Sequence, residues 1–386
     1  MTKPRIAVVT SYFPSSQEPY RGHSTYQTLR HLTTQADLCA FVPYLRYPHW
    51  YNPREARYQR MDLSYQPPGM AARYFEYTTL PLIGRPLNGE LAYRQVRRAV
   101  EEFKPDLILN YWLYPDGYAA VKLGRHLGVP VIVAALGSDV RRIDDRPTRF
   151  WTRRTLVQAD WLITVSRELA ERAAEMGARP DRTTAILNGY DETVFYPGDQ
   201  VAERAKLGCQ ADAEAILYVG SLIPSKGLRE LMEAFVSLAG RRPRLHLVCG
   251  GEGPLRAEMV AMAQRAGLAG RLVLPGKLSS SQVRDWMVAA DLFCLPSYSE
   301  GCPNVVIEAL ATGRAVVATN VGGIPELVSP ANGVLVEARD AAALETGLER
   351  ALAQRWDPAL VAATYRRDWR LVAADTWSVC QRLLAR

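Results

Sequence analysis

Several signatures are missing from this 386-residue sequence, and each absence excludes a class of protein. The six cysteines are scattered and form no Cys-x-x-Cys pair, which argues against a zinc site and against a disulfide scaffold. No run of eighteen apolar residues occurs, so we expect no membrane-spanning helix. The apolar run at residues 6–10 is short and continues into a Pro/Ser-rich loop, which predicts a buried strand rather than a signal peptide. These observations favour a reducing cytoplasm.

The dinucleotide fingerprint Gly-x-Gly-x-x-Gly is also absent. The nearest match, at residues 251–256, lacks the third glycine. The loop after the first predicted strand, residues 11–22, lacks the fingerprint as well. A nicotinamide-dependent dehydrogenase or a nucleotide-sugar epimerase is an alternative function, but the absence of the usual phosphate-binding loop argues against it.

The composition is that of an ordinary globular protein, with 48% hydrophobic and 23% charged residues. A chain of this length accommodates two domains. Charge is uneven: residues 1–195 hold 26 basic and 20 acidic residues, whereas the remainder holds 21 and 20. The basic half is a solvated surface or a face toward an anionic membrane or a phosphate-bearing acceptor; nucleic acid is disfavoured, because no binding motif accompanies the charge.

Short apolar runs alternate with longer amphipathic ones along the chain. The runs that predict strands lie at residues 6–10, 38–42, 107–111, 129–135, 161–165, 216–220, 245–249, 272–274, 292–295 and 315–319. Helical periodicity between them, as at 92–103, 167–176 and 228–238, predicts parallel sheets covered by helices. The pattern restarts near Ala215, which predicts two doubly wound domains with ligands at the carboxyl ends of strands. The stretch 43–93 is rich in Tyr, Trp and Arg and is predicted to be largely irregular.

The segment at residues 297–328 is the most informative part of the sequence. Glu308 stands in the apolar run 305–311, so its carboxylate is predicted to be buried and to need a partner, such as the hydroxyl groups of a ligand. Pro303 suits the start of a helix, and Gly301 lets the backbone approach a ligand closely. Residues 301–305 therefore predict an anion site at a helix N-terminus, as a nucleoside diphosphate sugar would require.

Glu300 and Glu308 in this context resemble the Glu-x7-Glu signature of retaining glycosyltransferases of family 4, which have the GT-B fold. The resemblance extends to residues 218–227, similar to the family's diphosphate-binding loop, to 249–254, similar to its base-proximal turn, and to 187–197, similar to its interdomain linker. These motifs cover roughly residues 185–330 and are weaker in the first half of the chain.

The resemblance implies two Rossmann-like domains facing a cleft: an acceptor-binding domain at 1–195 and a nucleotide-sugar-binding domain at 196–366. The final helix, 367–386, is expected to cross back to the first domain; the alternative is a terminal helix on the second. The implied activity is transfer of a hexose from a UDP- or GDP-linked sugar to a glycan or lipid-linked acceptor, with retention. No Asp-x-Asp pair is present, so we expect no metal and no cofactor.

Carried over residue by residue, the resemblance makes Lys226 and Glu300 the catalytic residues, one at the diphosphate and one at the sugar. Glu308 would hold the ribose. The remaining substrate-binding candidates of this half are Gly220, Ser221, Gly251, Glu252, Gly276, Cys302, Pro303, Asn304 and Val305. Ser221 stands where the family commonly has an arginine, so another cation is expected to meet the phosphate charge.

The first half departs from the family pattern. Gly22, with His23 beside it, is the candidate for close approach to the donor phosphates, although His23 is equally well explained as a capping or surface residue. Asn110 or Tyr111 occupies the place where many members carry a histidine. Asp116 and Asp139 are candidates for polar roles in substrate binding, with turn formation as the alternative. A non-catalytic two-lobed sugar-binding protein is the remaining alternative function.

Overall fold

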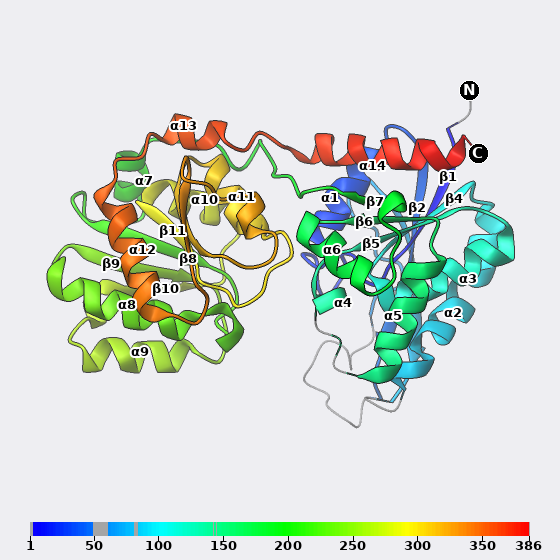
Figure 1. Ribbon diagram of the computed structural model, residues 1–386, viewed down its shortest axis with the longest axis horizontal. Coiled ribbons are helices and arrows are strands. Elements are labelled where there is room, and N and C mark those ends of the chain that lie inside the picture. The colour runs from blue at the N-terminus through cyan, green and yellow to red at the C-terminus, as the bar shows by residue number, and fades with distance from the viewer. Residues whose placement is uncertain (1–2, 49–60, 81–83, 142, 144, 386) are drawn as a thin grey trace. The chain divides into compact units, whose positions relative to one another are not determined.

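The computed structural model describes residues 3–48, 61–80, 84–141, 143 and 145–385 (Figure 1). The chain divides into two compact units: unit 1 comprises Met1–Leu187 with Trp369–Arg386, and unit 2 comprises Asn188–Asp368. Among the described residues, no helix is long and apolar enough to cross a membrane.

Unit 1 is built on a parallel sheet that has seven strands within the described residues, in the order β3-β2-β1-β4-β5-β6-β7. The strands are β1 (Arg5–Val9), β2 (Asp37–Arg46), β3 (Ala71–Thr78), β4 (Leu107–Tyr111), β5 (Val131–Ala135), β6 (Trp161–Thr164) and β7 (Thr183–Ala185). The chain adds strands outward on one side of β1 and then returns to add β4 on the other. The loops after β1 and β4 therefore diverge, which makes this the place where doubly wound sheets bind ligands.

The helices of unit 1 are α1 (His23–Leu32), α2 (Asn88–Phe103), α3 (Tyr118–Leu127), α4 (Ser138–Arg141), α5 (Arg146–Gln158), α6 (Arg167–Glu175) and α14 (Trp369–Leu384). Local chemistry sets their starts: Asp145 accepts a hydrogen bond from the Thr148 amide at the start of α5. The final helix α14 lies beside α1 (Figure 1), and its Trp369, Val372 and Leu383 join the core of unit 1.

Unit 2 repeats the architecture with six strands in its described residues, in the order β10-β9-β8-β11-β12-β13. They are β8 (Glu214–Val219), β9 (Leu245–Gly250), β10 (Leu272–Gly276), β11 (Leu292–Leu295), β12 (Ala315–Thr319) and β13 (Gly333–Val336). The helices are α7 (Gln200–Lys206), α8 (Leu228–Arg241), α9 (Arg256–Arg265), α10 (Ser280–Ala289), α11 (Asn304–Ala311), α12 (Ala341–Ala353) and α13 (Pro358–Ala363). Here the strand order reverses between β8 and β11. The predicted fold class, two doubly wound parallel-sheet domains, is confirmed.

The prediction of a largely irregular stretch at 43–93 is wrong for the residues described there. Strand β2 continues to Arg46, β3 pairs with it, and α2 begins at Asn88. The aromatic residues masked the strand: Tyr44, Tyr74 and Tyr77 are buried between the sheet and its covering elements. Residues 49–60 lie outside the described residues; they include Trp50, Tyr51, Tyr58, Arg54, Arg57 and Arg60 of this aromatic and basic stretch. The short strands β7 and β13 were also missed.

Candidate active site

The loops after β8 and β11 bring Lys226 and Glu300 together at the reversal point of unit 2. Lys226 ends a short turn of 3-10 helix (Pro224–Lys226), and its Nζ lies 2.5 Å from Oε1 of Glu300. The Glu300 side chain is 13% exposed and that of Lys226 is 24% exposed, so the pair is largely shielded from water. The two residues predicted to be catalytic, 74 positions apart in sequence, thus form one ion pair.

Backbone and side-chain hydrogen bonds hold these two loops in place. The amide of Tyr298 donates to the carbonyl of Ser225 at 3.0 Å, which joins the loop carrying Glu300 to the turn carrying Lys226. The Tyr298 hydroxyl donates to Glu230 at 2.6 Å, and Thr319 Oγ1 donates to the carbonyl of Ser297 at 2.5 Å. The ion pair is therefore positioned from three sides by β8, α8 and β12.

Glycines allow the ends of β8, β9 and β10 to meet beside this pair. Gly220 donates to the carbonyl of Gly250 at 2.9 Å, and Gly251 donates to Gly276 at 2.7 Å. Gly251 has φ 142°, and a Cβ there would lie 1.9 Å from the Gly220 carbonyl oxygen, so no other residue fits. The Glu252 side chain reaches Gly276, where a Cβ would meet its Oε1 at 2.9 Å. Ser221 is exposed at the start of the loop.

The start of α11 is held by the segment that enters unit 2. Asn188 Nδ2 donates to the carbonyl of Cys302 at 3.0 Å and to Oδ1 of Asn304 at 2.8 Å, with Pro303 between them. Burial raises the pKa of the Cys302 thiol to about 12, so it stays protonated and is no nucleophile. Val305 follows in the first turn and is half-buried. The predicted phosphate-binding segment is thus tied to Asn188 at both sides of Pro303, at the start of an eight-residue helix.

Glu308 lies on α11, one turn after this start. Its side chain is half-buried, and desolvation raises the pKa of its carboxyl group to about 7. Within the described residues no cation or hydrogen-bond donor contacts this carboxylate. A half-buried carboxylate that has no protein partner among the described residues is an acceptor available to ligand hydroxyls.

At the reversal point of unit 1, the loop after β1 meets the loop after β4. Gly22 has φ 62°, and a Cβ there would lie 2.0 Å from the Tyr12 carbonyl oxygen, so the turn before α1 requires glycine. His23 is half-buried and makes an edge-to-face contact with Trp369 of α14, with 6.4 Å between ring centroids. Tyr12 stacks on Trp112 at 5.2 Å. The two loops are therefore joined through aromatic rings.

The polar candidates of unit 1 are buried and bind backbone groups of their own unit. Asn110 Nδ2 donates to the Val9 carbonyl at 2.8 Å, which links β4 to β1. Asp116 accepts from the amide and hydroxyl of Ser11 at 2.6 and 2.7 Å, and burial raises its pKa to about 7. Asp139 accepts from Gly137, Leu136 and Leu113 amides at 2.8 to 3.2 Å, and burial raises its pKa to about 6.

No group of three or more His, Cys, Asp or Glu side chains suited to a metal ion occurs in the part of the chain that the structure describes. The sequence alone did not identify the residues that hold the loops around the candidate site in position. Asn188 and Tyr298 hold the unit 2 loops, and Ser11, Tyr12 and Trp112 join the unit 1 loops. Tyr298 could have been found from its place two residues before Glu300, whereas the Tyr12–Trp112 contact spans a hundred positions and leaves no local signal.

Comparison with known proteins shows which family this chain belongs to. Residues 199–369 match the family described as glycosyl transferases group 1, and residues 43–194 match glycosyltransferase family 4. A D-inositol 3-phosphate glycosyltransferase of Frankia alni is 31% identical over 296 residues, covering 71% of each chain. The chain belongs to the family 4 glycosyltransferases.

Other relatives and solved structures agree with this membership. A Bacillus subtilis glycosyltransferase assigned to teichuronic acid biosynthesis, TuaC, is 28% identical over 375 residues, covering 90% of this chain and 88% of TuaC. Sucrose-phosphate synthase from Thermosynechococcus elongatus superimposes with a TM-score of 0.77 at 21% identity, covering 99% of both chains. Anabaena HepE in complex with UDP gives a TM-score of 0.76 at 18% identity, covering 99% of this glycosyltransferase and 100% of HepE. These structures establish the GT-B fold.

Proposed function

We propose that this glycosyltransferase transfers a hexose from a UDP- or GDP-linked sugar to a glycan or lipid-linked acceptor, with retention of anomeric configuration and without a metal ion. The observation that carries the proposal is the Lys226–Glu300 pair, largely shielded from water at the reversal point of unit 2. The Glu308 carboxylate on α11, which has no partner among the described residues, adds to it. Unit 2 would bind the donor and unit 1 the acceptor.

The charges of the pair suit the two ends of a sugar diphosphate. The Lys226 ammonium stabilises negative charge that develops on the departing diphosphate, and Glu300 accepts hydrogen bonds from hydroxyl groups of the sugar. In the ligand-free protein each group satisfies the other at 2.5 Å. Binding of the donor would separate them and give each a partner of its own, so neither charge is left buried and unpaired at any stage.

The remaining unit 2 residues fit the rest of such a donor. Gly220, Ser221, Gly251 and Gly276 leave backbone next to the ligand, Glu252 faces the base, and Glu308 receives the ribose hydroxyls. Residues 302–305 provide backbone amides for phosphate or sugar oxygens. The diphosphate of HepE's bound UDP has the same chemistry, which supports a nucleoside diphosphate as the common element.

Retention follows if the acceptor attacks from the face that the diphosphate leaves. The bond between the anomeric carbon and the diphosphate oxygen breaks, the acceptor oxygen bonds to the same carbon, and the acceptor proton moves to the departing oxygen. No protein base is needed in this scheme, so the protein contributes positioning and charge stabilisation. In unit 1, Gly22 and His23 would contact substrate, while Asn110, Asp116 and Asp139 would fix the loops that receive the acceptor.

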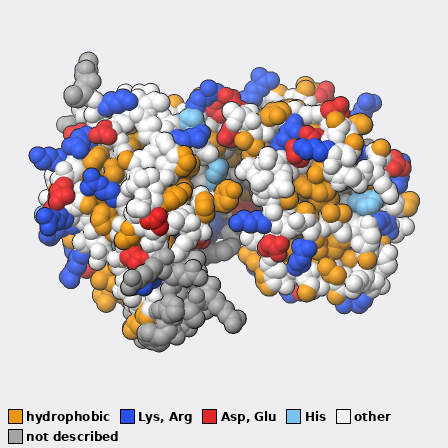
Figure 2. All heavy atoms as spheres, turned by 180° about the vertical axis from the view of Figure 1, so that it is seen from behind, with side chains coloured by type: hydrophobic (Ala, Val, Ile, Leu, Met, Phe, Trp, Pro, Cys, Tyr) orange, Lys and Arg blue, Asp and Glu red, His pale blue; other side chains and the backbone are white. Residues whose placement is uncertain are grey.

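We also propose that unit 1 docks on an anionic membrane surface through α5. This helix carries Arg146, Arg149, Arg153 and Arg154 and no acidic residue, and Phe150 and Val157 are 55% and 53% exposed. On the face shown in Figure 2, basic side chains are interspersed with acidic ones rather than gathered in one patch. Each basic residue near an anionic surface contributes about 1 kcal/mol. Co-sedimentation should favour anionic over neutral vesicles and weaken with salt; equal binding to both would contradict this.

The proposed reaction is tested by product analysis. The purified enzyme is incubated with a panel of UDP- and GDP-sugars and candidate glycan acceptors, and the anomeric configuration of the product is read by NMR. A product with the configuration of the donor supports the proposal. An inverted product would contradict the proposed mechanism, and absence of transfer from every nucleoside diphosphate sugar would contradict the donor class.

A further inference from the structure

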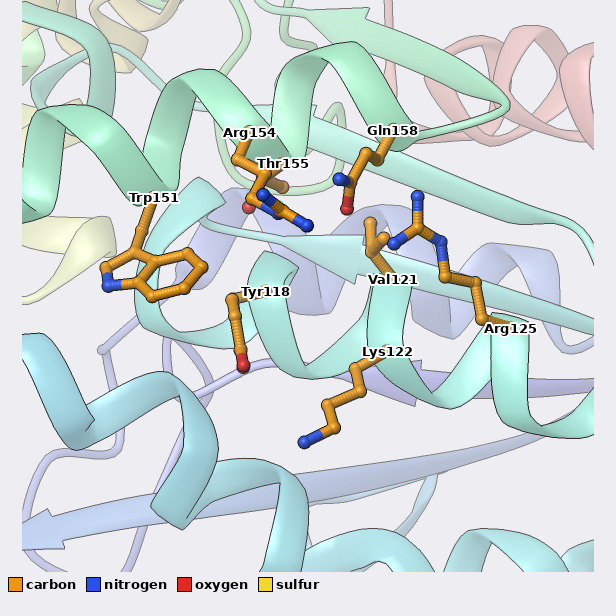
Figure 3. A pocket seen from close by; sticks show the side chains of 8 residues that line it. All are labelled: Tyr118, Val121, Lys122, Arg125, Trp151, Arg154, Thr155 and Gln158. Atoms are coloured by element: carbon orange, nitrogen blue, oxygen red, sulfur yellow. The ribbon is translucent and has the colours of Figure 1, made fainter.

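A groove lies between α3 and α5 and contains none of the residues assigned to donor binding or catalysis, although it shares Arg154 with the α5 surface described above. Its volume is about 220 Å³, and it is lined by Tyr118, Val121, Lys122, Arg125, Trp151, Arg154, Thr155 and Gln158 (Figure 3). The lining positions recur every three or four residues along each helix, so both helices turn one continuous face toward the groove.

Two of the three cations in the lining lack a carboxylate partner. Lys122 is engaged elsewhere: its Nζ lies 2.5 Å from Oε2 of Glu90 and 4.4 Å from the centre of the Tyr93 ring. Arg125 and Arg154 make no ion pair within the described residues. Figure 3 shows their guanidinium groups reaching from opposite helices toward the space beside Val121 and Gln158, while Lys122 points away from it.

A buried hydroxyl adds an independent indication of a ligand. Thr155 is 2% exposed and lines the groove, and its Oγ1 has no hydrogen-bond partner in the part of the chain that the structure describes. A buried polar group without a partner costs free energy, and a ligand oxygen at this place would remove that cost. The Gln158 amide offers a further donor.

The neighbouring wall is aromatic and apolar. Trp151 makes an edge-to-face contact with Tyr118 at 4.9 Å, and Val121 is buried at the base of the groove. Guanidinium groups from two sides with a hydroxyl and an amide suit a phosphate, which presents three acceptor oxygens, better than a planar carboxylate. An indole ring beside them suits the apolar face of a sugar or another flat group.

We propose that this groove binds a phosphate group carried by a molecule with an apolar face, held by Arg125 and Arg154 with Thr155 and Gln158, and with Trp151 beside it. The site lies within unit 1 and uses none of the residues assigned to donor binding or catalysis. The phosphate could belong to a soluble sugar phosphate or to a lipid headgroup, because the shared chemistry is the same. The proposal does not depend on the transfer reaction.

The test is fluorine NMR of the enzyme labelled with 5-fluorotryptophan, because the Trp151 signal reports this groove whether or not phosphate also binds elsewhere. Trp151→Phe assigns the signal. Inorganic phosphate, glucose 1-phosphate and methyl glucoside are titrated, with sodium chloride at matched ionic strength as control. Vesicles of neutral lipid with and without phosphatidic acid form the second arm.

We expect the Trp151 signal to shift saturably with phosphate or glucose 1-phosphate but not with methyl glucoside. The double variant Arg125→Gln/Arg154→Gln should raise the dissociation constant about tenfold or more. Arg153→Gln, which removes the neighbouring charge on the same helix outside the groove, should change the dissociation constant of soluble phosphate less than about twofold. Thr155→Val, nearly isosteric, should weaken binding by a few-fold.

A shift with phosphatidic acid vesicles alone supports the site and identifies the source as a headgroup if Arg125→Gln on α3 removes it; a shift that Arg125→Gln leaves unchanged reports docking of α5 and overturns the groove site. The proposal is overturned if neither soluble phosphate nor anionic vesicles shift the Trp151 signal. It is also overturned if the double variant binds soluble phosphate as wild type does, or if Arg153→Gln loses as much affinity for soluble phosphate. Unchanged dispersion of the tryptophan signals without ligand establishes that each variant is folded.

Discussion

The two units share a doubly wound parallel sheet, but different side chains stand where the strand order reverses in each. In unit 2 the loops after β8 and β11 present a lysine and a glutamate to each other, and Glu308 on α11 has no partner among the residues that the structure describes. In unit 1 the loops after β1 and β4 are joined by Asp116, whose carboxylate is fully buried and binds Ser11. One reversal point holds an ion pair that we propose to be separated by a charged ligand, and the other uses its carboxylate to fix the backbone.

The largest effect is expected from Lys226→Ala, which removes the cation proposed to stabilise the departing diphosphate. Loss of one preorganised electrostatic group costs about a hundredfold or more in kcat. Lys206→Ala is the matched control, because Lys206 also pairs with a carboxylate of unit 2, at 2.6 Å from Asp285. Steady-state kinetics of both variants provide the measurement. If the kcat/KM of Lys226→Ala differs from that of wild type by less than about fivefold, roughly 1 kcal/mol, Lys226 is an ordinary surface lysine.

The second effect sharpens the role of Glu308. Glu308→Gln keeps the volume and removes the charged acceptor, and hydrogen bonds to charged groups contribute about 1.5–3 kcal/mol. Affinity for the nucleoside diphosphate, measured by calorimetry, should fall roughly ten- to a hundredfold. Glu233→Gln, an exposed carboxylate on α8, is the control. Unchanged affinity in Glu308→Gln would remove this residue from the site.

The pH dependence of binding tests the same residue in wild type. Burial raises the pKa of Glu308 to about 7, so the charged acceptor becomes populated as pH rises through that value. Nucleoside diphosphate affinity should therefore gain a component that increases between about pH 6 and pH 8 and is missing from Glu308→Gln. Identical pH profiles for the two proteins would contradict this.

In unit 1 the comparison predicts an effect on stability rather than on catalysis. Burial raises the Asp116 pKa to about 7 in the folded state, well above its ordinary value of 3.8. Between these values the folded state binds a proton that the unfolded state releases, so this group makes stability fall as pH rises. Asp116→Asn keeps an acceptor for Ser11 and should gain stability relative to wild type from pH 5 to pH 8 in thermal unfolding. A difference that stays constant with pH would show that Asp116 is not buried as described.

The smallest effect is expected from chelation. The sequence contains no Asp-x-Asp, and the proposed departure of the diphosphate relies on Lys226 and backbone amides. EDTA should change activity by less than about twofold, within the scatter of such measurements. Complete loss on chelation with recovery on adding Mn²⁺ or Mg²⁺ would contradict the proposed mechanism.

Local patterns predicted most of the fold, and they named the two residues of unit 2 that form the Lys226–Glu300 ion pair. The five-residue apolar runs gave β1, β4 and β12, because strands buried on both faces read as continuous hydrophobic segments. Edge strands such as β3 have one face less covered, so its mixture of Tyr, Arg and Glu hid it. In unit 2 the candidate residues Lys226, Glu300 and Glu308 stand within short motifs, so the sequence alone was enough to name them as candidates.

In unit 1 the sequence alone did not predict what the polar residues contact. Asn110, Asp116 and Asp139 were named for their polarity beside strand ends, yet each binds backbone across the sheet, at partners up to 105 positions away in sequence. Only the tertiary structure distinguishes a buried carboxylate that holds a loop from one that awaits a ligand. Asn188 illustrates the same point in unit 2, since its contact with Cys302 spans 114 positions.

The central claim is that unit 2 binds a nucleoside diphosphate at the Lys226–Glu300 reversal point. Thermal unfolding of wild type and Lys226→Ala with UDP, GDP, ADP and NAD tests it most directly. A ligand at a hundred times its Kd stabilises the folded state by about 2.7 kcal/mol. The account predicts a raised Tm with UDP or GDP, a clearly smaller rise in Lys226→Ala, and no rise with NAD. Stabilisation by NAD alone, or an equal rise with UDP or GDP in both proteins, would contradict it.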